Sequence, residues 1–220
     1  MNGAPPRLGP YEPLLELASG GMGTVYLSRH AGAAGFARLV VVKRVHPHLL
    51  KSREFYDMFR DEARLASQIR HPNVVPVDDV VAGEGELFSV QPYIESITLA
   101  DLLDGAAAQG ERVPPAVASR VIGEMLAGLD GAHDATDLRG HALEIVHRDV
   151  SPQNVLVGRD GRSRLIDFGI AKAKRRVTHT SSGVLKGKLA YMAPEQLRRQ
   201  EVDRRVDVFA AGVVLYEALV

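Results

Sequence analysis

Two kinds of hydrophobic pattern divide the chain near residues 92–96. Before this point, short alternating or β-branched runs predict strands; they cover residues 11–17, 25–28, 39–42, 74–81 and 87–91. A helical pattern interrupts them and is expected to end at 71–73, where a proline follows a histidine. Its apolar positions, spaced three and four residues apart, are Phe55, Met58, Phe59, Ala66 and Ile69. The first part of the chain is therefore expected to be a five-stranded sheet with one main helix.

Helical patterns dominate after residue 94. An apolar stripe runs through Val117, Val121, Met125 or Leu126, and Leu129. Two short strand candidates, 154–157 and 164–166, flank a turn at 160–161. The last apolar run, 208–220, is too short to cross a bilayer and predicts a buried helix. The whole pattern predicts an α+β fold with a sheet-based first lobe, 11–94, and a mostly helical second lobe, 95–220.

Composition excludes several classes of function. Lys plus Arg and Asp plus Glu each number 27, so the formal net charge is zero and neither a nucleic-acid nor a membrane partner is indicated. There is no cysteine, which excludes disulfides, zinc–thiolate sites and thiol catalysis and fits the cytoplasm. Residues 1–10 lack the apolar core of a signal peptide and are expected to form a flexible tail.

A glycine-rich turn between the first two predicted strands allows close approach to an anion. Gly20, Gly21 and Gly23 leave backbone N–H groups without a Cβ in front of them. Taken alone, an ordinary hairpin turn remains the simpler interpretation.

Lys43 ends the third predicted strand, and Glu62 falls on the apolar face of the predicted helix. A carboxylate on that face needs a cationic partner, which favours a Lys43–Glu62 ion pair over two solvated side chains.

A cluster of acid and amide side chains carries the chemistry. Asp149 and Asn154 are five residues apart with Pro152 between them, and Asp167 follows thirteen residues after Asn154. Such a loop can direct an acid at a substrate hydroxyl and an amide at a metal, while Asp167 supplies the carboxylate that Mg²⁺ prefers. Each piece alone could be a turn or a cap; their joint order makes that improbable.

Taken in order, these motifs resemble the protein kinase superfamily, and in detail its bacterial eukaryotic-like (Hanks-type) serine/threonine branch. The matching segments are the glycine turn, 41–43, Glu62, 147–154, 167–169 and 193–195. The resemblance implies a bilobal protein kinase fold over 11–220. Asp207 and Gly212 would lie at the start of the central helix of the second lobe, after which the chain would be truncated.

The resemblance also implies roles for individual residues. Lys43, paired with Glu62, would hold the α- and β-phosphates of ATP; Asp149 would accept or orient the substrate hydroxyl; Asn154 and Asp167 would hold Mg²⁺. The implied ATP-binding residues are Leu17, Gly20, Gly21, Gly23, Val25, Val41, Lys43, Gln91, Pro92, Ile94 and Leu156. The apolar members of this set could equally be core residues.

Regulation and structure are implied at a further group of positions. Arg148, beside Asp149, implies control by a phosphate on the activation segment, which autophosphorylation in trans could supply. The candidate acceptors are Thr178, Thr180, Ser181 and Ser182. A solvated loop without this function is an equally open alternative. Phe168 and Glu195 would be structural, and Glu195 would pair with an arginine in a later helix. Since the chain stops at Val220, we expect a fragment of a longer coding sequence.

Three positions depart from the kinase pattern. Ala18 replaces the first glycine of the usual loop, which should tighten that loop without abolishing nucleotide binding. Ser151 stands where serine/threonine kinases carry a lysine, and Lys188 stands where they carry a threonine. Relative to the family pattern the hydroxyl and the cation have exchanged positions, and our hypothesis is that Lys188 supplies the missing catalytic charge.

The sequence therefore predicts a cytoplasmic bacterial serine/threonine protein kinase, a signalling enzyme that uses ATP and Mg²⁺. Its protein substrate is not predicted. A nucleotide-binding pseudokinase that acts as an interaction module is the main alternative, favoured by Ser151 and the missing helices. A small-molecule phosphotransferase of kinase-like fold is a weaker alternative, because segment 193–195 shapes a peptide platform in the family.

The exchange hypothesis predicts that Lys188→Ala slows phosphoryl transfer by one to two orders of magnitude. Loss of one charge-assisted contact costs roughly 1.5–3 kcal/mol, which converts to about that factor in rate. The double change Ser151→Lys with Lys188→Thr should restore transfer. Steady-state rates of the two variants decide the matter, and a Lys188→Ala variant with unchanged transfer contradicts the hypothesis.

Overall fold

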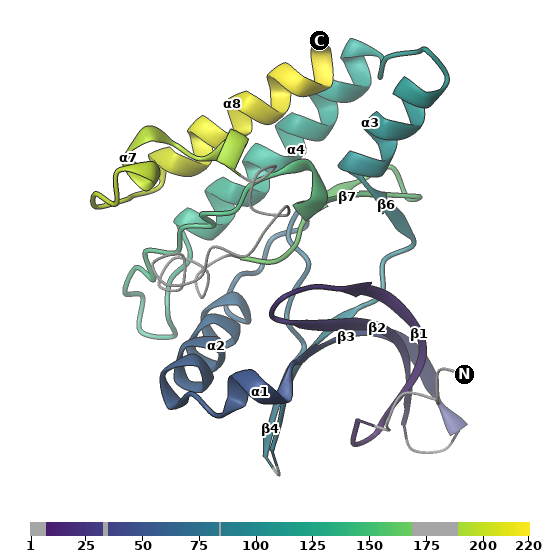
Figure 1. The fold of residues 1–220 in the computed structure, drawn as a ribbon, viewed down its shortest axis with the longest axis vertical. Coiled ribbons are helices and arrows are strands. Elements are labelled where there is room, and N and C mark those ends of the chain that lie inside the picture. The colour runs from purple at the N-terminus through teal and green to yellow at the C-terminus, as the bar shows by residue number, and fades with distance from the viewer. Residues whose placement is uncertain (1–7, 33–34, 84, 169–188) are drawn as a thin grey trace. The chain divides into compact units, whose positions relative to one another are not determined.

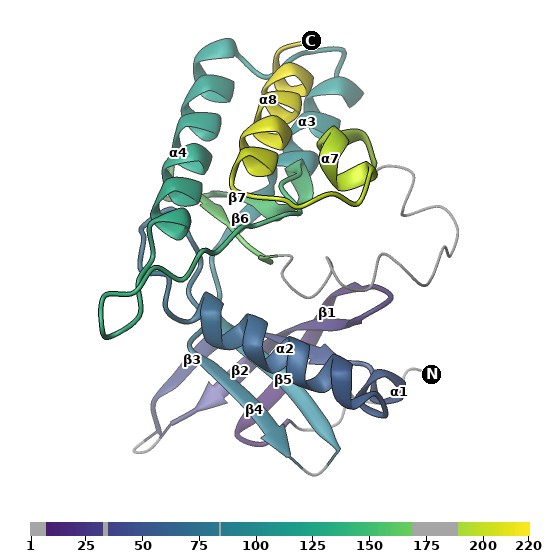
Figure 2. The same cartoon turned by 90° about the vertical axis from the view of Figure 1, so that its left-hand side faces the viewer.

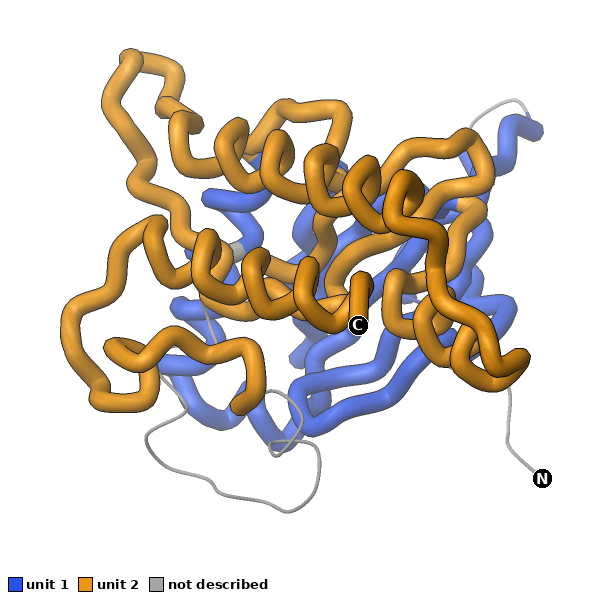
Figure 3. The backbone as a smooth tube through the Cα atoms, turned by 90° about the horizontal axis from the view of Figure 1, so that it is seen from above, with its two compact units in different colours: residues 1–67, 76–94 blue, residues 68–75, 95–220 orange. Residues whose placement is uncertain are grey.

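The computed structural model describes residues 8–32, 35–83, 85–168 and 189–220, with the side chain of Glu62 left out. Part of the predicted tail, the whole candidate phosphorylation segment and Lys188 therefore lie outside the described residues. The chain forms two compact units (Figure 3). The first comprises Met1–Ser67 and Pro76–Ile94, and the second Gln68–Val75 and Glu95–Val220.

An antiparallel sheet of five strands forms the first unit, in the order β1-β2-β3-β5-β4; Figure 2 labels all five. Its strands are β1 (Tyr11–Ser19), β2 (Gly23–Ala31), β3 (Ala37–Val45), β4 (Asp79–Gly83) and β5 (Glu86–Pro92). Because side chains alternate along a strand, Val40 and Val42 of β3 enter a buried cluster with Phe88 and Val90 of β5. Val41 and Lys43 therefore face the opposite side of the sheet.

One main helix packs against this sheet, as predicted (Figure 2). It is α2 (Arg53–Ala66), which the short α1 (Pro47–Leu50) precedes. Ser52 caps α2 by accepting a hydrogen bond from the N–H of Phe55 at 3.3 Å. The apolar stripe of α2 is buried with Val45, Leu49 and Leu87 in a second cluster. The predicted five-stranded sheet with one main helix is thus confirmed.

Two predicted boundaries in this region are wrong. The strand predicted over 74–81 begins only at Asp79, because Pro76 lacks an N–H and interrupts the ladder. The helix predicted to reach 71–73 ends at Ala66, where the Ser67 hydroxyl donates to the carbonyl of Arg64 at 2.8 Å. Ile69 is nevertheless buried, because residues 68–75 belong to the second unit.

The second unit is mostly helical and contains a three-stranded sheet in the order β6-β7-β8. Its strands are β6 (Ser96–Thr98), β7 (Val155–Gly158) and β8 (Ser163–Leu165). Its helices are α3 (Leu99–Ala108), α4 (Pro115–His133), α7 (Pro194–Leu197) and α8 (Arg205–Leu219), with 3-10 turns η2 (Pro152–Asn154) and η3 (Leu189–Tyr191). The hydrophobic pattern missed β6, which is too short to show a period of two.

Helices α4 and α8 lie side by side along this unit (Figure 1). On α4, Met125 is buried and Leu126 is exposed, which decides the alternative left open by the sequence. Val117 is also exposed, so its predicted place in the stripe is wrong: it lies in the first turn of α4, at the end of the packed face. The predicted burial of 208–220 holds for one face of α8 only, since Val208, Phe209 and Tyr216 are exposed.

None of the described helices has the length and apolarity that a membrane span requires.

A glycine notch on α4 receives the segment 68–75. A Cβ added at Gly128 would stand 2.6 Å from the carbonyl oxygen of Asn73 and 3.2 Å from Cδ1 of Leu165. Asn73 is fixed at this place, since its carbonyl accepts from the N–H of Leu165 at 2.9 Å and its amide donates to the carbonyl of Ser163 at 2.8 Å. The notch therefore cannot widen without breaking contacts to β8.

We predict that Gly128→Ala lowers the free energy of unfolding by about 1–3 kcal/mol through overpacking. Gly123→Ala on the same helix is the matched control, because a Cβ there meets no atom within 4 Å. That control should be stabilised by about 0.4–1 kcal/mol, the usual gain of Gly→Ala in a compatible conformation. Urea unfolding of both variants measures the difference, and equal shifts would show that the notch is not tight.

Candidate active site

The run 147–154 forms a buried polar loop in the second unit. His147, Asp149, Ser151 and Asn154 are each less than a tenth exposed. Buried polar groups require hydrogen-bond partners, so the conformation of this loop depends on which groups supply them. Two sets of contacts do so: one from α8 and one within the loop.

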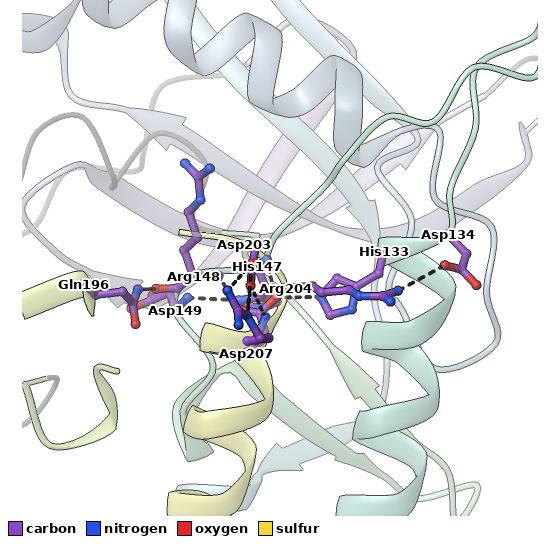
Figure 4. A network of polar contacts seen from close by, with 10 residues as sticks. His133, Asp134, His147, Arg148, Asp149, Gln196, Asp203, Arg204 and Asp207 are labelled. Carbon is purple, nitrogen blue, oxygen red and sulfur yellow. Dashed lines mark hydrogen bonds and ion pairs between the residues drawn. The ribbon is translucent and has the colours of Figure 1, made fainter. Parts of the chain in front are cut away.

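Asp207, in the first turn of α8, anchors the start of the loop (Figure 4). One carboxylate oxygen accepts from the N–H of His147 at 2.8 Å, and the other accepts from the N–H of Arg148 at 2.7 Å. The Nε2 of His133 lies 2.8 Å from the first of these oxygens. Because a carboxylate only accepts, that nitrogen of His133 must carry the proton. Arg148 has a left-handed φ of 63°, and the two adjacent N–H bonds to one carboxylate hold this strained conformation.

Asn154 closes the loop onto Asp149. Its side-chain nitrogen donates to the carbonyl of Asp149 at 2.7 Å and to the carboxylate of Asp149 at 2.9 Å. The η2 turn brings the two residues together, since the N–H of Asn154 also donates to the carbonyl of Ser151 at 2.9 Å. With its nitrogen used twice, the amide presents its oxygen as the group left for a cation. This is the ligand atom that a hard cation prefers.

Residues 166–168 are joined to the same loop. The N–H of Ile166 donates to the carbonyl of Asn154 at 3.0 Å, and the ring of His147 donates to the carbonyl of Ile166 at 3.1 Å. Phe168 is buried with its ring centroid 4.6 Å from that of His147. Asp167, between these two fixed residues, has a left-handed φ of 58°. The structure thus brings the backbone of Asp167 beside the Asp149–Asn154 pair within one unit.

Ser151 lies at a small cavity beside Asp149. The cavity is lined in part by Asp149, Ser151, Tyr191, Met192, Gln196 and Ala210. The Ser151 hydroxyl is buried and has no hydrogen-bond partner among the described residues. Its predicted counterpart, Lys188, lies outside them. The exchange of these two side chains therefore stays a prediction.

The segment 193–196 joins the loop from the other side. Gln196 accepts from the N–H of Ala193 at 3.0 Å and donates to the carbonyl of Arg148 at 3.2 Å. Glu195 lies beside it in α7 and is half-buried. Nearby, the hydroxyl of Tyr191 donates to Glu217 at 2.6 Å. Burial and this carboxylate raise the pKa of Tyr191 well above its usual range.

The remaining predicted residues lie mostly in the first unit. Gly23 is required where β2 starts, because a Cβ there would overlap the carbonyl of Arg44. Lys43 pairs in register with Val25 of β2 and Ser89 of β5, and Val41 pairs with Gln91. Leu17 is exposed on β1 and Pro92 ends β5. Ile94 is the last residue of the first unit, while Leu156 lies in β7 of the second unit.

Comparison with known proteins decides the family. The model of the family described as "Protein kinase domain" matches residues 11–220. This chain belongs to the protein kinase domain family. The kinase fold follows for both units, and the predicted superfamily and its bacterial branch are confirmed.

Relatives and solved structures of this kinase domain agree. It is 46% identical over 211 residues to the tyrosine-protein kinase MasK of Myxococcus xanthus (strain DK1622), covering 96% of this chain and 33% of that protein. It is 35% identical over 211 residues to the serine/threonine-protein kinase PknH of Mycobacterium tuberculosis (strain ATCC 25618 / H37Rv), with 96% and 31% covered. The chain spans about a third of the length of these curated relatives. The crystal structure of the M. tuberculosis PknI kinase domain (C20A_R136A double mutant) superposes with a TM-score of 0.74 at 25% identity, with 99% and 76% covered.

Sequence reasoning missed two residues that shape this kinase site. His133 gave no signal, because a histidine at the end of an amphipathic helix is unremarkable by itself. Gln196 could have been found: it stands three residues after Ala193, the position at which a Glu or Gln side chain bonds back to a helix start. Asp207 was noted as a motif residue, but its role as a threefold acceptor follows only from the structure.

We predict that Asp207→Asn lowers the free energy of unfolding by about 1.5–3 kcal/mol, the range for a hydrogen bond to a charged group. An amide can accept on its oxygen only, so its NH₂ group would face one of the donors. Asp203→Asn is the matched control, since this exposed acid bonds only Arg205 in the contacts of the described residues. Urea unfolding should leave the control unchanged. Equal losses in both variants would contradict the anchoring role.

Proposed function

We propose that the protein is a signalling protein kinase that transfers the γ-phosphate of ATP to hydroxyl groups of proteins. The observation that carries this proposal is the double hydrogen bond from Asn154 to Asp149. It fixes the acid that meets the substrate hydroxyl relative to the amide that meets the metal. The kinase domain itself spans residues 11–220 in this proposal. Its lobes divide near residue 94, except that residues 68–75 belong to the second unit.

In the transfer step, Asp149 orients the acceptor hydroxyl and accepts its proton. The bond between the hydroxyl oxygen and the γ-phosphorus forms as the bond to the β,γ-bridging oxygen breaks, and ADP leaves. Lys43, oriented by Glu62, would hold the α- and β-phosphates, and the glycine turn would cover them. The adenine would lie among Val25, Val41 and Leu156, with Pro92 and Ile94 as backbone partners.

The side chains present fit Mg²⁺. Protein sites for this ion use one or two carboxylates together with substrate phosphates and water, so a cage of acids is not needed. Within the described residues, no group of three or more His, Cys, Asp or Glu side chains could hold a metal. Asn154 would supply its amide oxygen and Asp167 its carboxylate, so these two residues would hold Mg²⁺. When bound, the ion neutralises charge on the phosphates.

Regulation by phosphate is part of the proposal. Arg148 has a buried Nε without a hydrogen-bond partner among the described residues. A phosphate on Thr178, Thr180, Ser181 or Ser182 would supply three acceptor oxygens to such a guanidinium. Autophosphorylation in trans is the simplest source of that phosphate.

Serine and threonine are the proposed acceptors, following relatives such as PknH. Tyrosine is a second candidate, because the 46% identical MasK is named a tyrosine-protein kinase. Ser151 is also buried and small at the position where a lysine would mark the serine/threonine enzymes. The acceptor residue must therefore be measured.

The deciding assay is transfer from radiolabelled ATP to a generic basic protein, followed by phosphoamino-acid analysis. We expect labelled serine and threonine, and a loss of about 10²–10⁴ in rate for Asp149→Asn, the usual contribution of a positioned base. Labelled tyrosine alone would replace the serine/threonine assignment. Undiminished transfer by Asp149→Asn would overturn the role of Asp149, and nucleotide binding without any transfer would favour the pseudokinase.

A further inference from the structure

His46 stands at the junction between β3 and α1 and contacts the glycine turn twice. Its ring Nε2 lies 2.8 Å from the carbonyl oxygen of Gly20. Its backbone N–H donates to the carbonyl of Met22 at 3.1 Å. Although His46 is the N-cap residue of α1, its side chain makes no capping bond to that helix. The ring is therefore used for the turn and not for the helix that it begins.

Apart from the packing of Met22, few contacts of the described residues hold the turn. One backbone hydrogen bond closes it, from the N–H of Gly20 to the carbonyl of Gly23 at 3.0 Å, and the hydroxyls of Ser19 and Thr24 lie 3.3 Å apart at its base. A Cβ built on Gly20 or Gly21 would meet no atom within 4 Å, so neither residue is confined by packing on that side. Glycine also has more backbone freedom to lose than any other residue. The two bonds from His46 are thus a large share of the hydrogen bonds that restrain the turn.

These two bonds fix the direction of the backbone N–H groups. A carbonyl can only accept, so Nε2 of His46 carries a proton in the bond to Gly20. In a planar trans peptide the C=O and the following N–H point in opposite directions. Because the carbonyls of Gly20 and Met22 both point at His46, the N–H groups of Gly21 and Gly23 point away from it. Backbone N–H groups that point to the same side of a turn can donate together to an anion on that side.

The segment that carries His46 is itself anchored. Leu49 of α1 is buried in the cluster that includes Val45 and Phe55, and Met22 at the tip of the turn packs against the same cluster. The N–H of Leu49 donates to the carbonyl of His46 at 2.9 Å. His46 is therefore held from the helical side and can serve as a fixed point for the turn.

We propose that His46 is a positioning residue for nucleotide binding, which aims the N–H groups of the glycine turn at the phosphates. The proposal rests on the proposed function, because the nucleotide is the ligand of the turn. His46 touches none of the reacting atoms, so its loss should weaken nucleotide binding and leave the maximal transfer rate nearly unchanged.

A pair of amide variants tests this proposal. In His46→Gln the side-chain nitrogen ends at about the distance of Nε2, so it can still donate to Gly20. In His46→Asn the amide is one carbon shorter and cannot reach. We expect the dissociation constant for ADP and the KM for ATP to rise about 3- to 10-fold in His46→Asn, the factor for one net hydrogen bond. His46→Gln should stay within about twofold of the unchanged protein, a difference too small to count as a lost hydrogen bond.

The matched control is His48→Asn. The ring of His48 stacks on that of His46 at 5.6 Å, but no contact described for His48 reaches the turn. Amide hydrogen exchange of Gly20 in the nucleotide-free protein gives a readout that needs no activity. Exchange should speed up in His46→Asn and remain slow in His46→Gln and His48→Asn.

The outcomes separate this proposal from the proposed function. Unchanged exchange and unchanged ADP binding in His46→Asn would overturn the role of His46 and leave the kinase assignment intact. Faster exchange in His46→Asn, with no nucleotide binding by the unchanged protein, would overturn the assignment and with it the nucleotide role of the turn. Equal defects in the Asn and Gln variants would also overturn the proposal, since the donated hydrogen bond would then not be the cause.

Discussion

The loop of residues 147–154 depends on one buried carboxylate. Asp207 accepts from two consecutive backbone N–H groups and from His133, so a single side chain on α8 satisfies donors of a loop and of α4. A buried charge is costly unless it is hydrogen-bonded, and three donors at once meet that requirement. The left-handed conformation of Arg148 follows from this anchor. The position of Asp149, the next residue, follows from Arg148.

A second layer of hydrogen bonds transmits this order to Asn154 and to residues 166–168. Asn154 bonds Asp149, Ile166 bonds Asn154, and His147 bonds Ile166. The bonds therefore form a ring that begins and ends in the loop that Asp207 holds. These linked hydrogen bonds hold the side chains of the site in place before any ligand binds. Catalysis that works by orienting the reactants requires such preorganisation. In the first unit, strand alternation achieves a comparable result by placing Val41 and Lys43 on one face.

The sequence predicted which polar residues lie together better than it predicted the boundaries of the strands and helices. Asp149, Asn154 and Asp167 could be singled out because the chemistry proposed for them requires both the residue types and the spacing. The five strands of the first unit were predicted because they are long enough to show alternation. The late start of β4 depends on Pro76, and β6 has only three residues, so neither leaves a periodic trace. His133 and His46 could not be identified, because each acts through a partner that is distant in sequence.

The segment 68–75 has a consequence for how the protein can be divided. It belongs to the second unit through Asn73, Val75 and the notch at Gly128, yet it lies in sequence between α2 and β4 of the first unit. The chain therefore passes between the units three times, after Ser67, Val75 and Ile94. A fragment starting at residue 95 would therefore lack residues 68–75, which pack into the core of the second unit. The two lobes are thus interleaved in the chain. Only Ser67 separates the last residue of α2 from the first residue of the unit that carries Asp149.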